Sequence, residues 1–298
     1  MHGTEFRGNW AARRGPGQLR HGCRAYRTPF PANIAAEITP SQPPAPMQFT
    51  VATFNIHKGF SHLTRRMVIH ELKEKLHGMS ADILFLQEVQ GVHHRNAGRY
   101  LDWPGKPQHE FIADTVWREV AYGRNAVYRQ GHHGNAILSR FPIITQENED
   151  ISAHVFENRG LLHCEIKLAE GAPNLHCINV HLGLFERGRQ WQIRSLTERI
   201  RATVPKGAPL IIAGDFNDWR RKGDRILTDE LGVYEVFDEV KGRPARTFPS
   251  VLPMFRLDRI YARRLDVHDA RVHYAFPSGR LSDHAALAAT FTLPRQRR

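Results

Sequence analysis

Four apolar segments of this sequence end on side chains that can take part in polar chemistry. Asn55, Glu88 and His181 each follow such a segment, and Asp215 and Asn217 follow the fourth. Buried strands that deliver carboxylate, amide or imidazole groups at their ends are the usual way in which α/β proteins assemble a site. We therefore expect these side chains to form one constellation.

Asp215 and Asn217 are two residues apart after Gly214, so both side chains can point into the same space. A carboxylate there can position water or a metal, and an amide can donate to a phosphoryl oxygen without adding charge repulsion. The alternative is an Asx-turn that closes a loop. Glu88 is a candidate ligand of a hard divalent cation, since a buried carboxylate needs a partner; the alternative is a glutamate past the strand end, exposed or ion-paired.

Ser282, Asp283 and His284 open the last strand-like segment. Neighbours on a strand face opposite sides, so Asp283 does not orient His284, and Asp258 is the candidate partner. Such a pair fixes the tautomer of the imidazole and makes it a competent base. His181 is a candidate to donate to a phosphate oxygen or to protonate a leaving group. For each histidine, the alternative is a structural role with its hydrogen bonds satisfied.

The elements that position these residues alternate between strands and helices from Met47 onward. The patterns predict helices over Thr64–His77, with Thr64 as N-cap, and over Gln190–Thr203. The predicted strands are Gln48–Asn55, Asp82–Glu88, Asn125–Tyr128, Asn135–Ser139, Gly160–Leu168, Leu175–His181, Leu210–Gly214, Leu257–Ala262 and His284–Leu293. One mixed-sheet domain over residues 47–294 fits this order better than two domains.

Composition places the chain among cytoplasmic globular proteins. Of its 298 residues 41% are hydrophobic, yet no apolar run is long enough to span a membrane, and no secretory signal is recognisable. The three cysteines form no paired framework, which predicts reduced thiols. Motifs typical of nucleotide cofactor binding and of serine or zinc hydrolysis are missing from the sequence.

The net charge of +12 lies mostly in the two ends of the chain. Residues 1–46 carry +4 and residues 295–298 carry +3, which leaves +5 for the segment between them. That balance suits a phosphate-bearing substrate but not a dedicated DNA-binding stripe. Residues 1–46 are expected to be a disordered, Pro- and Gly-rich tail, with Met47 as an alternative start; the other interpretation is a phosphate-binding arm. Residues 295–298 are expected to be a short basic tail.

In sequence order, these motifs resemble the endonuclease/exonuclease/phosphatase superfamily. The matching positions are Asn55, Glu88, Gly-Asn-Ala-Ile-Leu-Ser-Arg (134–140), His181, Gly-Asp-Phe-Asn (214–217), Leu-Asp-Arg (257–259) and Ser-Asp-His (282–284). The resemblance implies an α+β, four-layer sandwich of the DNase I type. In that fold, two mixed β-sheets pack face to face, helices flank them, and the site lies at one edge.

The resemblance also implies roles for individual residues. Glu88 would bind Mg²⁺ or Mn²⁺, with Asn55 supporting metal or phosphate and Asp283 completing the metal region. Asp215 would position or deprotonate water, and His284, oriented by Asp258, would be the general base or a phosphate ligand. The residues that would hold the scissile phosphate are Asn217, His181 and Arg159.

The substrate is left open between two classes. The leading hypothesis is a Mg²⁺-dependent phosphodiesterase, acting as a monomer on a phosphate ester such as nucleic acid. The alternative substrate is a phospholipid or a phosphorylated small molecule. Val180-His181-Leu182 departs from the pattern of abasic-site endonucleases, and the chain resembles a stand-alone bacterial subgroup. A third hypothesis is a catalytically dead binding scaffold. The presence of every expected acid, amide and imidazole argues against it.

Overall fold

Strand β1 (Gln48–Asn55) is the first element of the computed structural model, which describes residues 47–62, 64–274 and 281–294. The two expected tails, residues 1–46 and 295–298, lie outside the described residues. The strands of the described part form two mixed sheets of six strands each.

The first sheet contains the two ends of the described chain. In spatial order its strands are β11 (Asp266–His273), β12 (Ala286–Thr292), β1, β2 (Ile83–His93), β4 (Gly131–Ser139) and β3 (Glu119–Tyr128). Only β1 and β2 are parallel neighbours, and helix α1 (Ile69–Gly78) makes the crossover between them.

The second sheet repeats this arrangement. In spatial order its strands are β5 (Ile143–Asp150), β6 (Gly160–Ile166), β7 (Leu175–His181), β8 (Leu210–Asp215), β10 (Asp258–Arg263) and β9 (Tyr234–Glu235). Its one parallel pair is β7 and β8, and helix α4 (Glu186–Thr203) connects them. The C-terminal ends of both parallel pairs therefore lie at the same edge of the sandwich.

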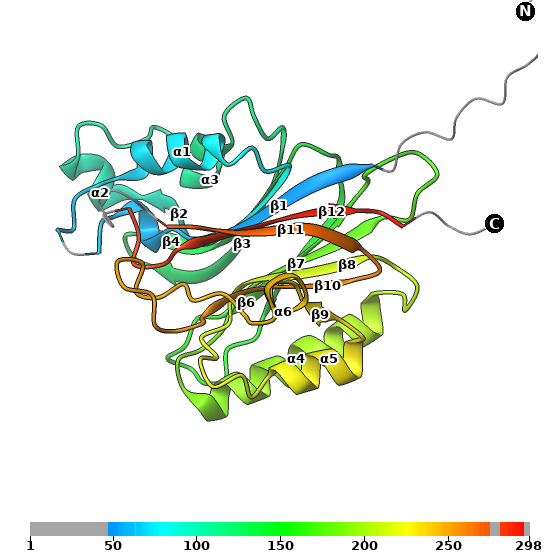
Figure 1. Cartoon of the computed structure of the whole chain (residues 1–298). Helices are drawn as coiled ribbons and strands as arrows, with labels where there is room; N and C mark the ends of the chain where they lie inside the picture. Colours follow the sequence, from blue (N-terminus) through cyan, green and yellow to red (C-terminus); the bar gives the residue numbers. More distant parts are fainter. Residues whose placement is uncertain (1–46, 63, 275–280, 295–298) are drawn as a thin grey trace, which may run out of the picture. The chain divides into compact units, whose positions relative to one another are not determined.

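The two sheets pack face to face and helices cover their outer faces (Figure 1). Helices α1 and α3 (Gln108–Ala113) pack on the first sheet, and α4 and α5 (Asp224–Leu231) pack on the second. The short helices are η1 (His57–Gly59) after β1, α2 (His94–Arg99) after β2, and α6 (Val236–Lys241), which contacts β10 and β11. The predicted four-layer α+β sandwich is confirmed.

The inward face of the strands changes from apolar to polar toward one edge. On β1, Phe49 and Val51 belong to the inter-sheet core, whereas Asn55 on the same face is polar and buried. On β8, Ala213 belongs to that core and Asp215 follows it on the same face. The apolar ends hold the sheets together, and the polar ends build the site.

Several predicted boundaries are wrong, for two physical reasons. Helix α1 begins at Ile69 because Thr64 lies in a turn, where its hydroxyl donates to Ser61 Oγ at 3.1 Å. Thr64 is therefore not an N-cap. The edge strands β5 and β11 were not predicted because exposed edges carry charged residues and lack apolar alternation.

Strand β12 is shorter than predicted, because it begins at Ala286 rather than at His284. Four other elements are several residues longer than predicted, and the short helices were also missed. Helix α4 begins at Glu186, β3 begins at Glu119, β2 continues past Glu88 to His93, and β4 takes in most of the expected loop at residues 129–134. These extensions are partly exposed, so their apolar periodicity is weak. Helices α2, α3, α5 and α6 have six to eight residues, too few to establish a helical period.

Candidate active site

Asp215 is contacted by polar side chains from both sheets. In the second sheet, His181 and Asp258 are its partners on β7 and β10. From the first sheet, Asn55 Nδ2 donates to Asp215 Oδ2 at 3.1 Å. The same oxygen lies 3.5 Å from His181 Nε2 and 3.7 Å from His284 Nε2. One amide and two imidazoles thus surround a single carboxylate oxygen.

Local backbone geometry makes this approach feasible. Gly214 has φ 145°, and a Cβ at this position would lie 2.0 Å from Val180 O, so only glycine fits. Asp215 Oδ1 accepts a hydrogen bond from the backbone N–H of Asn217 at 3.0 Å. This is the Asx-turn considered as the alternative, and it coexists with the convergence at Oδ2. Asn217 Nδ2 donates to Leu182 O at 2.9 Å, which uses one of its two side-chain hydrogens.

Asp258 is hydrogen-bonded to His284, the partner that the sequence predicted, although His284 lies in the loop before strand β12, which begins at Ala286. His284 Nδ1 lies 2.8 Å from Asp258 Oδ2, and both side chains are buried. Ser282 fixes this segment to the first sheet, because its hydroxyl donates to Asn55 O at 2.7 Å and accepts from His284 N at 3.2 Å. The imidazole is therefore held between Asp258 and Asp215.

The charges of these groups follow from their surroundings. Burial favours neutral His284, but Asp258 and Asp215 outweigh it and raise its pKa to about 10. Burial, with a contribution from Asp258, raises the pKa of Asp215 to about 6 against the opposing charge of His284. Burial and the nearby Arg159 lower the pKa of His181 to about 3. At neutral pH the site thus holds an imidazolium, a neutral imidazole and a carboxylate that gains a proton near pH 6.

Glu88 is placed by a break in the sheet. The pairing of β2 with β4 shifts between Leu86 and Val89, and Glu88 has φ 57° in this bulge. Its Oε2 lies 3.5 Å from Lys58 Nζ. Burial favours the protonated acid, but His181, Lys58 and His57 outweigh burial and lower the pKa of Glu88 to about 2.

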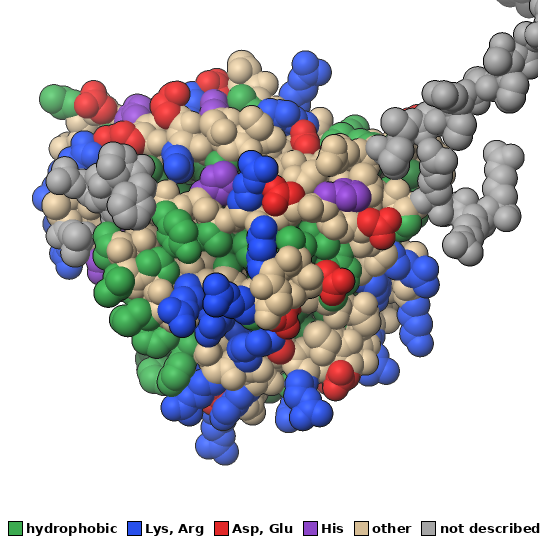
Figure 2. Space-filling view, viewed as in Figure 1, with side chains coloured by type: hydrophobic (Ala, Val, Ile, Leu, Met, Phe, Trp, Pro, Cys, Tyr) green, Lys and Arg blue, Asp and Glu red, His purple; other side chains and the backbone are tan. Residues whose placement is uncertain are grey.

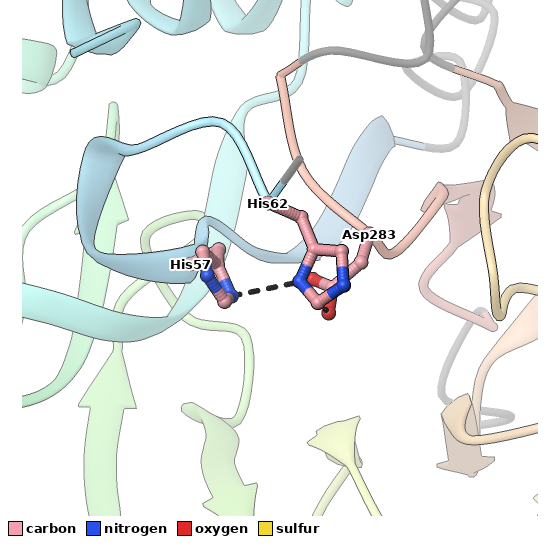
Figure 3. Close-up of side chains that lie close together, drawn as sticks. All are labelled: His57, His62 and Asp283. Atoms are coloured by element: carbon pink, nitrogen blue, oxygen red, sulfur yellow. Dashed lines mark ion pairs between the residues drawn. The ribbon is translucent and has the colours of Figure 1, made fainter. Parts of the chain in front are cut away.

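Asp283 lies beside two other histidines, His57 and His62 (Figure 3). Its two oxygens lie 3.4 Å from His57 Nδ1 and 3.3 Å from His62 Nδ1. Burial opposes ionisation, yet the hydrogen bond from His57 and the nearby imidazoles lower the pKa of Asp283 to about 2. In turn, that hydrogen bond raises the pKa of His57, with a further contribution from the charge of Glu88.

The donor atoms here fit a divalent cation better than those around Asp215. Asp215, Asp258 and His284 lie close enough to share an ion, but all three are buried and His284 Nδ1 is already hydrogen-bonded to Asp258. The group of His57, His62 and Asp283 is partly exposed and supplies an ionised carboxylate. The region between Glu88 and Asp283 is therefore the candidate metal site.

The predicted metal set differs in detail from this arrangement. Asn55 Oδ1 accepts from the backbone N–H of His57 at 3.1 Å, and its Nδ2 faces Asp215. Asn55 thus joins the metal region to the catalytic region through its two ends. Arg159 lies near His181, and its buried Nε has no hydrogen-bond partner among the described residues.

Two groups of residues were missed in the sequence. The first is His57, Lys58 and His62, whose only signal is that they lie within seven residues after Asn55. The second is a buried amide pair: Gln87 Nε2 donates to Asn179 Oδ1 at 2.8 Å across the two sheets. Asn179 stands two residues before His181, so alternation on β7 could have placed it on the same face.

The chain is similar to known proteins over most of its described length. Residues 52–284 match the model of the Endonuclease/Exonuclease/phosphatase family. The uncharacterized protein YbhP of Escherichia coli (strain K12) is 45% identical over 245 residues, which cover 82% of this chain and 96% of YbhP.

Two solved structures share the fold. D. rerio TDP2 complexed with a single-strand DNA product has a TM-score of 0.62 at 18% identity and covers 82% of this chain and 99% of its own. The human Nocturnin catalytic domain with bound sulfate has a TM-score of 0.63 at 19% identity and covers 84% and 94%. The chain belongs to the endonuclease/exonuclease/phosphatase family.

Proposed function

We propose that the protein is a Mg²⁺- or Mn²⁺-dependent phosphodiesterase that acts through Asp215 and His284. The observation that carries this proposal is the convergence of Asn55, His181 and His284 on Asp215 Oδ2. Each of these buried polar groups must be desolvated when the chain folds, which costs stability. A functional role therefore explains such a cluster better than a structural one.

The proposed division of labour follows from the charges. Asp215, with a pKa of about 6, is ionised at neutral pH and accepts the proton of the attacking water. His284, kept cationic by Asp258, donates to a phosphoryl oxygen and stabilises the charge that develops there. His181, Asn55, Asn217 and Arg159 are proposed to donate to the remaining phosphate oxygens.

The metal region completes the charge balance. Glu88 and Asp283 would hold the cation, together with the nearby imidazoles of His57 and His62, and Asn55 would link it to Asp215. A bound divalent cation neutralises phosphate charge and polarises the scissile ester. Carboxylates suit Mg²⁺ and Mn²⁺, and the imidazoles make Mn²⁺ the better match of the two.

Purified protein should hydrolyse bis-p-nitrophenyl phosphate when Mg²⁺ or Mn²⁺ is present. Hydrolysis should stop when a chelator removes the metal. Asp215→Asn should abolish turnover, whereas Asp229→Asn, at an exposed position of α5, should not change it. Turnover that is independent of metal, or that survives both Glu88→Ala and His284→Ala, would reject the proposal.

Two substrate classes are candidates for this site. D. rerio TDP2, which shares the fold, is complexed with a single-strand DNA product, and this likeness favours nucleic acid. The exposed basic residues Arg220, Arg221 and Lys222 lie near the site in sequence and suit the same class. Exposed apolar side chains around the site favour a phospholipid instead. The exposed side chains are an observation on this chain, whereas the likeness to TDP2 is a comparison with another protein.

We also propose that the protein acts as a cytoplasmic monomer. Cys164 and Cys177 are buried free thiols, as expected in a reducing compartment. None of the helices in the described part of the chain is long and apolar enough to cross a bilayer. Size-exclusion chromatography with light scattering would test the oligomeric state, and fractionation of cells would test the location.

A further inference from the structure

Two loops of the second sheet carry exposed apolar side chains beside the catalytic residues. Val155 and Phe156 lie in the loop before β6 and are 89% and 92% exposed. Leu184 and Phe185 lie in the loop after β7 and are 68% and 73% exposed. Because β6 and β7 are antiparallel neighbours, both loops leave the sheet at the edge that holds His181.

Two further loops carry apolar side chains at the same edge. Trp219 follows the end of β8 and packs edge-to-face on Phe255, with ring centroids 6.0 Å apart. Phe255 pairs with Phe248 just before β10, and the exposed Leu252 and Met254 lie between them in sequence. All four loops therefore surround the ends of the strands that carry the proposed catalytic residues. Figure 2 shows hydrophobic side chains gathered toward one side of the molecule.

One cavity lies beneath this apolar surface. Its volume is about 240 Å³, and its lining includes the apolar Phe156, Leu184 and Phe185 together with the polar His133, Glu157 and Arg159. Arg159 Nε lies 4.0 Å from Glu157 Oε1, so the cavity contains an ion pair as well as apolar surface. Buried Arg159 Nε and His133 Nδ1 have no hydrogen-bond partner among the described residues. Such a cavity can hold apolar chain and a polar or anionic group at once.

Basic side chains accompany the apolar loops. A second cavity of about 500 Å³ is lined by Lys241, Arg243, Arg246 and Arg256, and no acidic residue lines it. Arg256 directly follows the Phe248–Phe255 loop, and Arg220 lies over the Trp219 ring at 4.5 Å. Apolar loops flanked by cationic groups are the combination that binds the surface of an anionic bilayer.

We infer that the catalytic edge docks on a bilayer containing anionic phospholipid and that the substrate is a phosphate ester of a lipid in that bilayer. This inference rests on the proposed hydrolase function and names its substrate class. Single-stranded nucleic acid would match the aromatic and cationic groups. It would leave Val155, Leu184, Leu252 and Met254 in water, however, because aliphatic side chains have no π face on which a base can stack.

Sedimentation of the full chain with lipid vesicles tests the docking surface directly. The vesicles contain either phosphatidylcholine alone or phosphatidylcholine with phosphatidylglycerol. Wild-type protein should bind the anionic vesicles, and Phe156→Ser/Phe185→Ser and Leu252→Ser/Met254→Ser should each bind at least about tenfold more weakly. Every variant keeps the basic residues 1–46, so a difference between variants reports the loops.

A matched control comes from the opposite end of the second sheet. Ile144 is half exposed on β5, near the end that lies away from the site, and Ile144→Ser should bind vesicles as the wild type does. The inference is overturned by wild-type protein that does not bind anionic vesicles, by loop variants that bind them equally well, or by binding of a single-stranded oligonucleotide in place of vesicles that depends on the same loops.

A separate measurement distinguishes the docking surface from the hydrolase itself. Asp215→Asn should lose hydrolysis of bis-p-nitrophenyl phosphate and keep wild-type vesicle binding, because Asp215 is buried behind the loops. Wild-type protein that binds vesicles through the loops but never hydrolyses the soluble ester would reject the hydrolase and retain the docking surface. Hydrolysis of the soluble ester without vesicle binding would retain the hydrolase and reject the lipid substrate.

Discussion

His284 and Asp258 share a hydrogen bond of 2.8 Å between Nδ1 and Oδ2, which leaves Nε2 of the imidazole facing the catalytic edge. The remaining nitrogen lies 3.7 Å from Asp215 Oδ2. One buried imidazole is thus shared by two carboxylates, and the pair of acids outweighs the effect of burial on its charge.

Removing the charge of Asp258 should change the role of His284. In Asp258→Asn, burial is opposed by Asp215 and, more weakly, by Asp283, so the pKa of His284 should fall from about 10. We expect kcat to fall about 100-fold, because the imidazole is no longer reliably cationic. Steady-state kinetics and NMR titration of the imidazole measure the two effects. Asp229→Asn is the control, and an unchanged imidazole titration would contradict the assignment.

The rate of hydrolysis should depend on pH through two groups. Asp215 must lose its proton to act as a base, so kcat/KM should rise as pH increases through about 6. His284 must keep its proton, so kcat/KM should fall as pH increases through about 10. A profile measured at saturating metal, from below the first value to above the second, tests this order. A rising limb at the ordinary histidine pKa of about 6.5 that is abolished by His284→Gln would instead identify the imidazole as the base.

Metal dependence should respond in opposite directions to two neighbouring residues. Glu88→Gln removes a ligand, so the half-saturating Mn²⁺ concentration should rise at least about tenfold. Lys58→Met removes the cation that lies 3.5 Å from Glu88, so the half-saturating concentration should fall. Titration of turnover with Mn²⁺ measures both. Glu74→Gln, at an exposed position of α1, should match the wild type, and equal metal requirements in all variants would exclude Glu88 as a ligand.

Asn179 should contribute to stability rather than to chemistry. Its Nδ2 donates to Leu86 O at 2.9 Å and to Ala136 O at 2.8 Å, so it satisfies two buried carbonyls beside the bulge in β2. Asn179→Ala should lower the free energy of unfolding by about 1–3 kcal/mol for each carbonyl left unpaired. Urea denaturation measures the loss. Asn148→Ala, at an exposed position, should leave the midpoint unchanged, and equal midpoints in both variants would contradict this role.

The sequence predicted which strand-end side chains lie close together because strands impose a strict alternation. Apolar residues along β1, β7 and β8 identify the inward face, and Asn55, His181 and Asp215 continue it. Asp258 was selected as the partner of His284 on the same rule and lies at hydrogen-bond distance, although Asp283 and His284 precede strand β12 and the rule does not apply to them. The resemblance to the endonuclease/exonuclease/phosphatase family then predicted the whole fold, and the match over residues 52–284 confirms that resemblance.

The metal region could not be predicted to the same depth, because it depends on backbone that leaves the regular strands. His57 and Lys58 have positive φ of 45° and 57°, and Glu88 lies in a bulge. No periodicity describes such positions, so their neighbours are known only when the chain is folded. His62, likewise, reaches Asp283 from a turn in which no strand or helix pattern operates.

The contact between Asn55 and Asp215 makes the candidate site a property of the assembled sandwich. Each residue belongs to a different sheet, and neither sheet contains both. A chain in which one sheet has formed but has not docked on the other would carry every strand end and still lack the bond between them. The proposed hydrolysis would therefore report the completion of folding, because it requires both sheets to have docked on each other.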